Sequence, residues 1–179
     1  MKIYTIADTH FFHDNIITYC NRPFKSIEEQ DRLLISKWNS TVTDNDLVIH
    51  LGDIALSKKS EDLKAVLKAL KGRKVLVQGN HDRRSRLWYL MSGISFVCDR
   101  FVWDRTIFTH RPMLLEQLDE YEFNVHGHIH EKVKEHYKYI NVSVEQINYT
   151  PINVERLIWE RRKHKQINNI QEIDIEKPQ

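Results

Sequence analysis

The chain is short of cysteine and of long apolar runs, and both shortages narrow the class of protein. Its 179 residues include two cysteines, Cys20 and Cys98, with neither CxxC nor zinc-ribbon spacing. With no secretory context, this pattern predicts reduced thiols in a cytoplasmic protein rather than a disulfide. Asp8 arrives too early for the apolar core of a signal peptide, and no apolar run approaches the roughly 20 residues that span a membrane. We therefore expect a cytoplasmic protein without a membrane partner.

A strong excess of charge of either sign is also missing. The formal net charge is +2, so composition gives no reason to expect a nucleic-acid or membrane-surface binder. Apolar residues make up 41% and charged residues 29%, which is the balance of an ordinary globular domain. With no repeat, low-complexity tract or convincing linker, we predict one α/β domain over residues 1–167 and a polar C-terminal tail over 168–179. Nothing in the sequence indicates the oligomeric state.

Short apolar runs rich in β-branched and aromatic residues alternate with amphipathic helical patterns. Ser26 and Glu29 have the spacing of a capping box, Ser60 is a candidate N-cap, and Gly72 is placed as a helix stop. Strands are predicted within residues 2–7, 46–51, 74–82, 94–110 (two or three strands), 123–130 and 139–145, and helices over 26–40, 60–72, 84–91 and 153–166.

Five of the predicted strands end in side chains that can bind metal. In open α/β sheets, ligands bind beyond the carboxyl ends of the strands. A packing explanation has to account for each polar cluster separately, whereas one shared site accounts for all of them. The candidate ligands are Asp8, His10, Asp53, Asn80, His110, His128 and His130.

The stretch FNVHGHIHE places three histidines, His126, His128 and His130, at alternating positions. If the strand pleat continued unbroken, the three imidazoles would share one face, which suits metal binding better than packing. A solvated, polar strand end is the alternative that this stretch leaves open when it is taken alone.

The strand-end set offers two carboxylates, one amide oxygen and four imidazoles. This exceeds the three or four protein ligands that a single zinc site takes. It suits two divalent cations about 3.5–4 Å apart, the arrangement that enzymes use for in-line displacement at phosphorus. Mixed nitrogen and oxygen ligands without a thiolate favour Mn, Fe or Zn, and spacing does not choose among these metals.

Five ordered motifs resemble those of the calcineurin-like metallophosphoesterases. They are D-x-H at 8–10, G-D at 52–53, G-N-H-D at 79–82, a lone histidine at 110 and G-H-x-H at 127–130. The segments DTHFFHDNII, THRP and YINVSVE are most similar to those of the small, cap-less prokaryotic and phage members. The resemblance implies an α/β fold of the metallophosphoesterase type, a β-sandwich flanked by helices in a single compact domain.

The resemblance also implies a role for each motif residue. Asp8, His10 and His130 would hold one metal, Asn80, His110 and His128 the other, and Asp53 would bridge them. His81 would stay off the metals and act on the leaving-group oxygen, either as general acid or by stabilising charge there. The implied reaction is hydrolysis of a phosphoester by a metal-bridging hydroxide, with His81 and Asp53 as the catalytic residues. Gly127 is expected to allow a tight turn, and His126, which has no matching role, to be an inward, packing imidazole.

Residues outside the motifs are candidates for contact with substrate phosphate. His13 and Asn15 follow the first motif, where a loop-capping role is an equal alternative. Arg22 and Arg83, together with Arg84 and Arg111, could clamp phosphate, although most surface arginines are merely solvated.

The substrate class is open within the phosphoesters. No cap domain fits between the motifs, and an open cleft favours a phosphodiesterase, with a phosphomonoesterase or phosphoprotein phosphatase as the alternative. A metal-dependent nuclease is a third possible function, and nucleic acid would then be a partner only as the substrate. Some relatives of this superfamily, such as a retromer subunit, are non-catalytic interaction modules, but they typically lose the residue corresponding to His81, which this chain retains.

Overall fold

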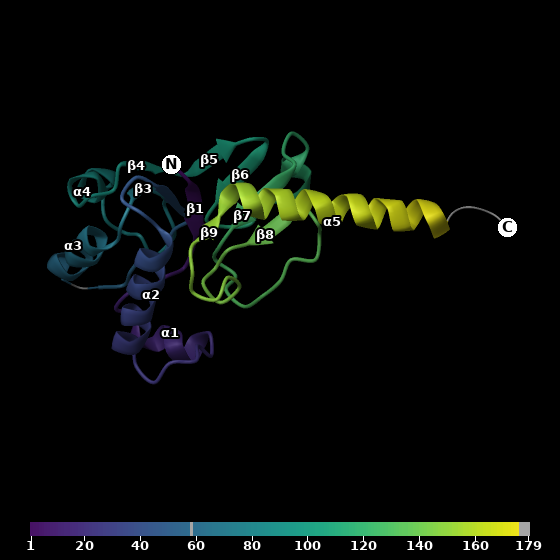
Figure 1. Cartoon of the computed structure of the whole chain (residues 1–179). Coiled ribbons are helices and arrows are strands. Elements are labelled where there is room, and N and C mark those ends of the chain that lie inside the picture. The colour runs from purple at the N-terminus through teal and green to yellow at the C-terminus, as the bar shows by residue number, and fades with distance from the viewer. Residues whose placement is uncertain (58, 176–179) are drawn as a thin grey trace.

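A computed structural model describes residues 1–57 and 59–175, which form two mixed β-sheets flanked by helices (Figure 1). The first sheet has the order β4-β3-β2-β1-β9, parallel except for the antiparallel pair of β1 and β9. Its strands are β1 (Ile3–Ile6), β2 (Leu47–His50), β3 (Arg73–Val77), β4 (Phe96–Cys98) and β9 (Ile152–Asn153).

The second sheet has the order β5-β6-β7-β8, antiparallel between β5 and β6 and parallel thereafter. Its strands are β5 (Arg100–Trp103), β6 (Thr106–Thr109), β7 (Phe123–His126) and β8 (Tyr139–Asn141). One apolar cluster joins the sheets, because Ile49 and Val75 of the first belong to the same buried core as Phe108 and Val125 of the second. The predicted sandwich in a single compact α/β domain is confirmed.

Helices cover the outer face of the first sheet, where they form a second apolar core with its strands (Figure 1). Leu34 and Trp38 of α2 and Leu67 of α3 are buried there against Leu76 of β3. No helix of the described ranges is long and apolar enough to cross a membrane. The helices are α1 (Asp14–Tyr19), α2 (Ile27–Thr41), α3 (Ser60–Ala69), α4 (Arg86–Met91), the 3₁₀ helix η1 (Leu115–Leu118) and α5 (Val154–Ile175).

The N-terminal capping predicted for two helices is confirmed only in part. Ser26 caps α2 by accepting a hydrogen bond from the Glu29 amide, but the Glu29 carboxylate accepts from the amide of Lys25, so only half of the predicted capping box forms. Ser60 is the first residue of α3 rather than its N-cap, and its hydroxyl accepts a hydrogen bond from Arg84.

The C-terminal helix α5 continues to Ile175, beyond residue 168, where the tail was predicted to begin. Residues 176–179 lie outside the described residues, and the boundary between domain and tail stays a prediction. Both cysteines are free thiols, as expected.

Candidate metal centre

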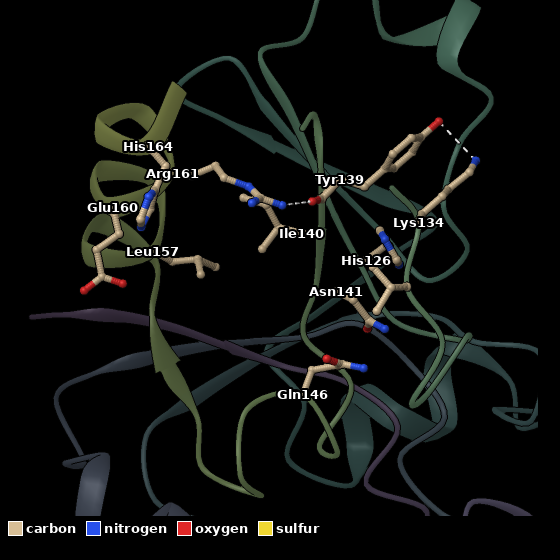
Figure 2. Close-up of a pocket in the computed structure, with 11 residues that line it drawn as sticks. His126, Lys134, Tyr139, Ile140, Asn141, Gln146, Leu157, Glu160, Arg161 and His164 are labelled. Atoms are coloured by element: carbon tan, nitrogen blue, oxygen red, sulfur yellow. Dashed lines mark hydrogen bonds between the residues drawn. The ribbon is translucent and has the colours of Figure 1, made fainter. Parts of the chain in front are cut away.

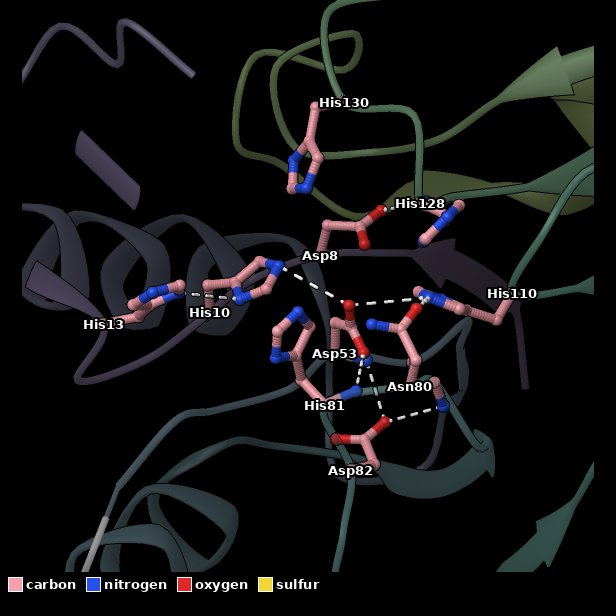
Figure 3. A network of polar contacts seen from close by, with 12 residues as sticks. Asp8, His10, His13, Asp53, Asn80, His81, Asp82, His110, His128 and His130 are labelled. Carbon is pink, nitrogen blue, oxygen red and sulfur yellow. Dashed lines mark hydrogen bonds and ion pairs between the residues drawn. The ribbon is translucent and has the colours of Figure 1, made fainter. Parts of the chain in front are cut away.

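The five polar strand ends converge at one place between the two sheets. Strands β1, β2 and β3 are parallel neighbours in the first sheet, and β6 and β7 are parallel neighbours in the second. Their carboxyl ends therefore open toward the same region. Figure 3 shows that side chains from the loops after these five strands gather there, although the loops are distant from one another in sequence. The seven ligand candidates named from sequence are all in this cluster: Asp8, His10, Asp53, Asn80, His110, His128 and His130.

The cluster divides into two groups of ligand atoms. Oxygen or nitrogen atoms of Asp8, His10 and His130 lie within 4.8 Å of one another, and those of Asp53, His110 and His128 do the same. Asn80 joins the second group, since its Oδ1 is 3.0 Å from Nε2 of His110.

The Asp53 carboxylate lies between the two groups. Its Oδ2 is 3.7 Å from Nε2 of His10 in the first group and 3.4 Å from Nε2 of His110 in the second. A carboxylate in this position can serve a cation on either side, because each of its oxygens carries lone pairs for a separate metal. This arrangement is the one that the sequence motifs imply for a bridging ligand.

Unsatisfied buried atoms in the cluster fit bound cations. Oδ1 of Asp8 and Nε2 of His10 are buried and have no hydrogen-bond partner in the described part of the chain. Leaving such groups without a partner costs roughly 1–3 kcal/mol each, and more for a charged group. Since carboxylate oxygen and imidazole nitrogen are ligands of Mn, Fe and Zn, a divalent cation would satisfy both atoms.

Burial decides the ionisation of four residues of the cluster: Asp8, His10, His110 and His128. Burial raises the pKa of Asp8 to about 7, against the opposing effect of the His130 charge. Burial likewise lowers the pKa of His10 and His110, and it lowers the pKa of His128 to about 4 with a further contribution from His110. These three imidazoles are therefore neutral near pH 7, which is the form that binds a metal.

The loops hold their ligands in strained backbone conformations. The φ angles are 57° at Asp8, 48° at His10, 56° at Asp53, 70° at His128 and 51° at His130. Non-glycine residues in this left-handed region cost about 1–3 kcal/mol each when the surroundings impose it, and they cluster at functional sites. The strand pleat ends at His126, so the three alternating histidines do not share a strand face as the unbroken pattern would require.

Two glycines allow close approach of the carboxylates. A Cβ atom at Gly79 would collide with Oδ1 of Asp53, and one at Gly127 would collide with Oδ2 of Asp8. The backbone turns directly after Gly127, where the amide of Ile129 donates to the Gly127 carbonyl, but the φ angle of Gly127 is not in the left-handed region, so this turn does not require the conformational freedom of glycine. The role of Gly127 is to leave space for the Asp8 side chain.

A second layer of side chains orients the ligands. Oδ2 of Asp8 accepts hydrogen bonds of 2.8 Å from the His128 amide and from the Ser143 hydroxyl, which leaves Oδ1 for a cation. Nδ1 of His130 lies 3.0 Å from Oε1 of Glu145, which leaves its Nε2 for a cation. Such outer contacts fix the ring orientation of a ligating histidine.

Arg22 is part of this second layer and does not face the substrate side. It is 4% exposed, and it forms an ion pair of 2.7 Å with Glu145. Its remaining donors are taken by Gln30 and by the backbone carbonyls of Asp8 and Thr9. The substrate contact expected for Arg22 is therefore replaced by a structural one, because its guanidinium has no free edge.

Asp82 supports the loop that carries the Asp53 ligand. Its carboxylate accepts hydrogen bonds from the amides of Asp53, Ile54 and Gly79, and it is 3% exposed. The G-N-H-D motif contains Asp82 but predicts no supporting role for it. Ser143 and Glu145 lie in the strand predicted over 139–145, although β8 ends at residue 141, and nothing in that pattern predicts their contacts. No local pattern distinguishes their contacts, since they join residues more than one hundred positions apart or in another loop.

A cavity of about 470 Å³ opens beside the first group of ligands. His81 lines it with its Nδ1 buried and without a partner, while its backbone amide donates to Oδ1 of Asp53. His13 lines the same cavity, and its Nδ1 lies 3.2 Å from Nδ1 of His10. Ile16 and Tyr19 of α1 add an apolar wall. This cavity has room for a substrate group directly next to the metal ligands.

The other substrate candidates are less well placed. Asn15 and Arg83 are exposed, and neither lines the cavity beside the ligands. Arg84 donates to Ser60 and lies over the ring of Trp88, and α4 begins only at Arg86. The guanidinium of Arg111 reaches Oδ1 of Asn80 at 3.5 Å, which makes it the best placed of the arginines considered from sequence.

His126 is fully buried, as expected for a packing imidazole, and its Nδ1 donates to the carbonyl of Gly127. His50 is also buried, with Nε2 at 3.0 Å from the hydroxyl of Thr9 and Nδ1 accepting from the amide of Gly52. Neither histidine belongs to the two groups of ligand atoms.

Comparisons with known proteins agree with this class of fold and site. The family model for calcineurin-like phosphoesterases matches residues 1–173, and the chain belongs to that family. An uncharacterized protein of Methanocaldococcus jannaschii is 37% identical over 180 residues, which cover 96% of this chain and 98% of the relative.

Two solved structures resemble the chain. A protein of unknown function from Aquifex aeolicus has a TM-score of 0.71 and 26% identity, over 89% of this chain and 98% of that one. The Pseudomonas putida nuclease MPE has a TM-score of 0.49 and 18% identity, over 72% of this chain and 61% of that one, and a likeness at this level says nothing about substrate.

Proposed function

We propose that the chain is a phosphodiesterase that hydrolyses its substrate at a centre of two divalent cations. The observation that carries the proposal is the position of Asp53 between two groups of ligand atoms, with His81 at the adjoining cavity. Asp8, His10 and His130 would hold one cation, and Asn80, His110 and His128 the other. Bound there, Mn, Fe or Zn would supply Lewis-acid charge and a water molecule of lowered pKa.

His81 is proposed as the general acid. It lies on the cavity side of the cluster, where a leaving group would be, and its backbone is fixed by the hydrogen bond to Asp53. Its ring forms an edge contact with that of His10, with centroids 5.4 Å apart, so it stands next to the ligands without belonging to either group. A positioned imidazole can deliver a proton to the departing oxygen.

The preference for diesters over monoesters is supported by the scarcity of arginine at the cluster. A monoester carries an additional negative charge and rewards several charge-assisted hydrogen bonds. Arg22 is already committed to Glu145, and Arg83 does not line the cavity, whereas Arg111 reaches a ligand side chain. The open cavity provides the room that a second ester substituent needs.

A panel of model esters tests this function. The protein is stripped with a chelator, reloaded with Mn, Zn or Fe, and assayed on aryl phosphodiesters, aryl phosphomonoesters and cyclic nucleotides. We expect turnover only with restored metal and faster turnover of diesters. Faster turnover of monoesters would favour the phosphatase alternative. Absence of turnover with every metal would favour a non-catalytic interaction module.

The Asp53→Asn variant provides the matched test of the metal centre. An amide offers one oxygen where the carboxylate offers two, so we expect metal content and activity to fall together. Full activity in this variant, measured with metal content by elemental analysis, would contradict the bridging role of Asp53.

A further inference from the structure

A second cavity, of about 300 Å³, lies between α5 and the strand β8 at the edge of the second sheet (Figure 2). One wall is a single face of α5, formed by residues spaced i, i+3, i+4 and i+7: Leu157, Glu160, Arg161 and His164. The opposite side is lined by His126, Val133, Lys134, Tyr139, Ile140, Asn141 and Gln146. None of these residues is among the metal-ligand candidates.

Arg161 brings a partly desolvated positive charge into this cavity. Its Nη2 donates to the backbone carbonyl of Tyr139 (Figure 2), and its Nε is buried without a hydrogen-bond partner among the residues that the structure describes. Burial lowers the pKa of the Arg161 guanidinium. Among the described residues, no carboxylate lies within 4.0 Å of it. A half-buried cation without a counter-charge is costly, and a bound anion would offset that cost.

The other two arginines of α5 are compensated by the chain itself. Arg156 pairs with Glu160 at 2.7 Å, and Arg162 pairs with Glu122 at 2.8 Å and with Asp104 at 3.0 Å. Within residues 1–57 and 59–175, acidic partners are thus present for Arg156 and Arg162 and absent for Arg161, the arginine of α5 that lines the cavity. An exposed arginine needs no acidic partner, because water solvates its charge. This does not explain the difference here, because the side chain of Arg161 is more buried than that of Arg162.

The remaining lining groups favour an anion with an organic body. Lys134 also lines the cavity, but its Nζ is turned away from Arg161 (Figure 2): it donates to the Met113 carbonyl and to the Tyr139 hydroxyl and lies 4.1 Å from the Tyr139 ring centroid. The one acid of the lining, Glu160, is held by Arg156. The remainder of the lining includes apolar side chains, namely Val133, Ile140 and Leu157.

We propose that this cavity binds a small organic oxyanion, a carboxylate or phosphate group on a compact apolar body, with Arg161 as the main recognition residue. Its volume is at the lower end of the range for small-molecule sites. The guanidinium offers planar, charge-assisted donors that match either oxyanion. The site depends on α5 and β8, so it operates whether or not the metal centre is loaded.

Titration with three probes of similar shape tests the proposal. Benzoate and phenylphosphonate carry the two oxyanions on the same apolar ring, and benzamide is their neutral counterpart. We expect one or both acids to shift the side-chain Nε–H resonance of Arg161 in NMR spectra, with saturation at millimolar concentrations. The shift is expected to persist in Asp53→Asn, which excludes binding through the metal centre. Saturation by phenylphosphonate alone identifies a phosphate site, and saturation by benzoate alone identifies a carboxylate site.

Two arginine variants complete the test. Arg161→Gln is expected to weaken binding of the acids at least about tenfold, the scale of a lost charge-assisted hydrogen bond. Arg162→Gln removes the same charge one position along the helix and is expected to leave binding within about twofold. Equal binding in Arg161→Gln, or binding of benzamide as tight as that of the acids, would overturn the proposal. If Arg161→Gln does not fold, the comparison of acids with benzamide in the wild-type protein decides.

Discussion

Nδ1 of His130 lies 3.0 Å from Oε1 of Glu145, and Glu145 is in turn paired with the buried Arg22. This chain of contacts crosses from the last motif loop to the segment after β8 and back to the loop after α1. It holds the His130 ring with Nε2 available for a cation. Three residues that are far apart in sequence thus define the position of one ligand.

We predict that Glu145→Gln weakens metal binding about 10–100-fold, the usual effect of removing an outer partner of a ligating histidine. The amide keeps the shape but loses the charge that orients the His130 ring and balances Arg22. Isothermal titration with Mn²⁺ measures the effect, and the exposed Glu116→Gln is the matched control. Unchanged affinity in Glu145→Gln would mean that the His130 ring needs no support from this carboxylate.

Metal uptake is predicted to release protons. Burial disfavours the charged form of His130, but hydrogen bonds with Cys20 and Glu145 and the charge of Asp8 outweigh it and raise the pKa of His130 to about 10 in the metal-free protein. Burial raises the pKa of Asp8 to about 7. A cation must therefore displace one proton between pH 7 and 10, and a second one below pH 7.

The apparent metal affinity should consequently rise with pH, about tenfold per pH unit for each proton released. The rise in affinity with pH should be steeper below pH 7, where two protons are displaced, than above pH 7, where one is displaced. Calorimetric titrations at pH 8 in buffers of different ionisation enthalpy count the protons directly. A count of zero at pH 8 would contradict the charged state assigned to His130.

His81→Ala is predicted to retain both metals and to lose about 10²-fold or more in rate. His81 is outside both ligand groups, so its removal leaves the metal contacts intact. The loss should be larger for alkyl esters than for nitrophenyl esters, because a poor leaving group needs the proton more. Elemental analysis and steady-state rates on the two ester types provide the measurement, with His136→Ala as control, because His136 belongs to neither ligand group and lines neither cavity. Full activity on alkyl esters would remove His81 from the reaction.

Gly127→Ala is predicted to damage the metal centre more than the fold. The new Cβ would collide with the Asp8 carboxylate, which must move away from its ligand position. Gly93→Ala is the contrasting variant, because nothing lies within 4 Å of its Cβ although its φ is +101°. We expect Gly93→Ala to lower the free energy of unfolding by about 1 kcal/mol through backbone strain. The metal content of this variant is expected to stay unchanged. Urea unfolding and metal content distinguish the two effects, and equal metal content would contradict the assignment for Gly127.

The sequence was sufficient to predict which side chains gather at one place, because the signal for each of them is local. Each motif sits at the carboxyl end of an apolar strand run, and parallel strands bring such ends to one edge of a sheet. The sequence therefore predicts that Asp53 and His110 share one site, although they lie 57 positions apart. The apolar runs also indicated the alternation of strands and helices, although short elements such as α1, η1 and β9 carry too few residues for a periodic pattern.

Only the tertiary structure decided which side chains support the ligands and which face outward. The local sequence around Arg22 and around Arg161 does not predict how differently the two side chains are placed. The first is buried against Glu145, and the second lines a cavity without an acidic partner. The same holds for the space next to Gly127, which depends on an aspartate 119 positions away. Such contacts join distant segments through packing, and packing between segments has no periodicity along the chain from which it could be read.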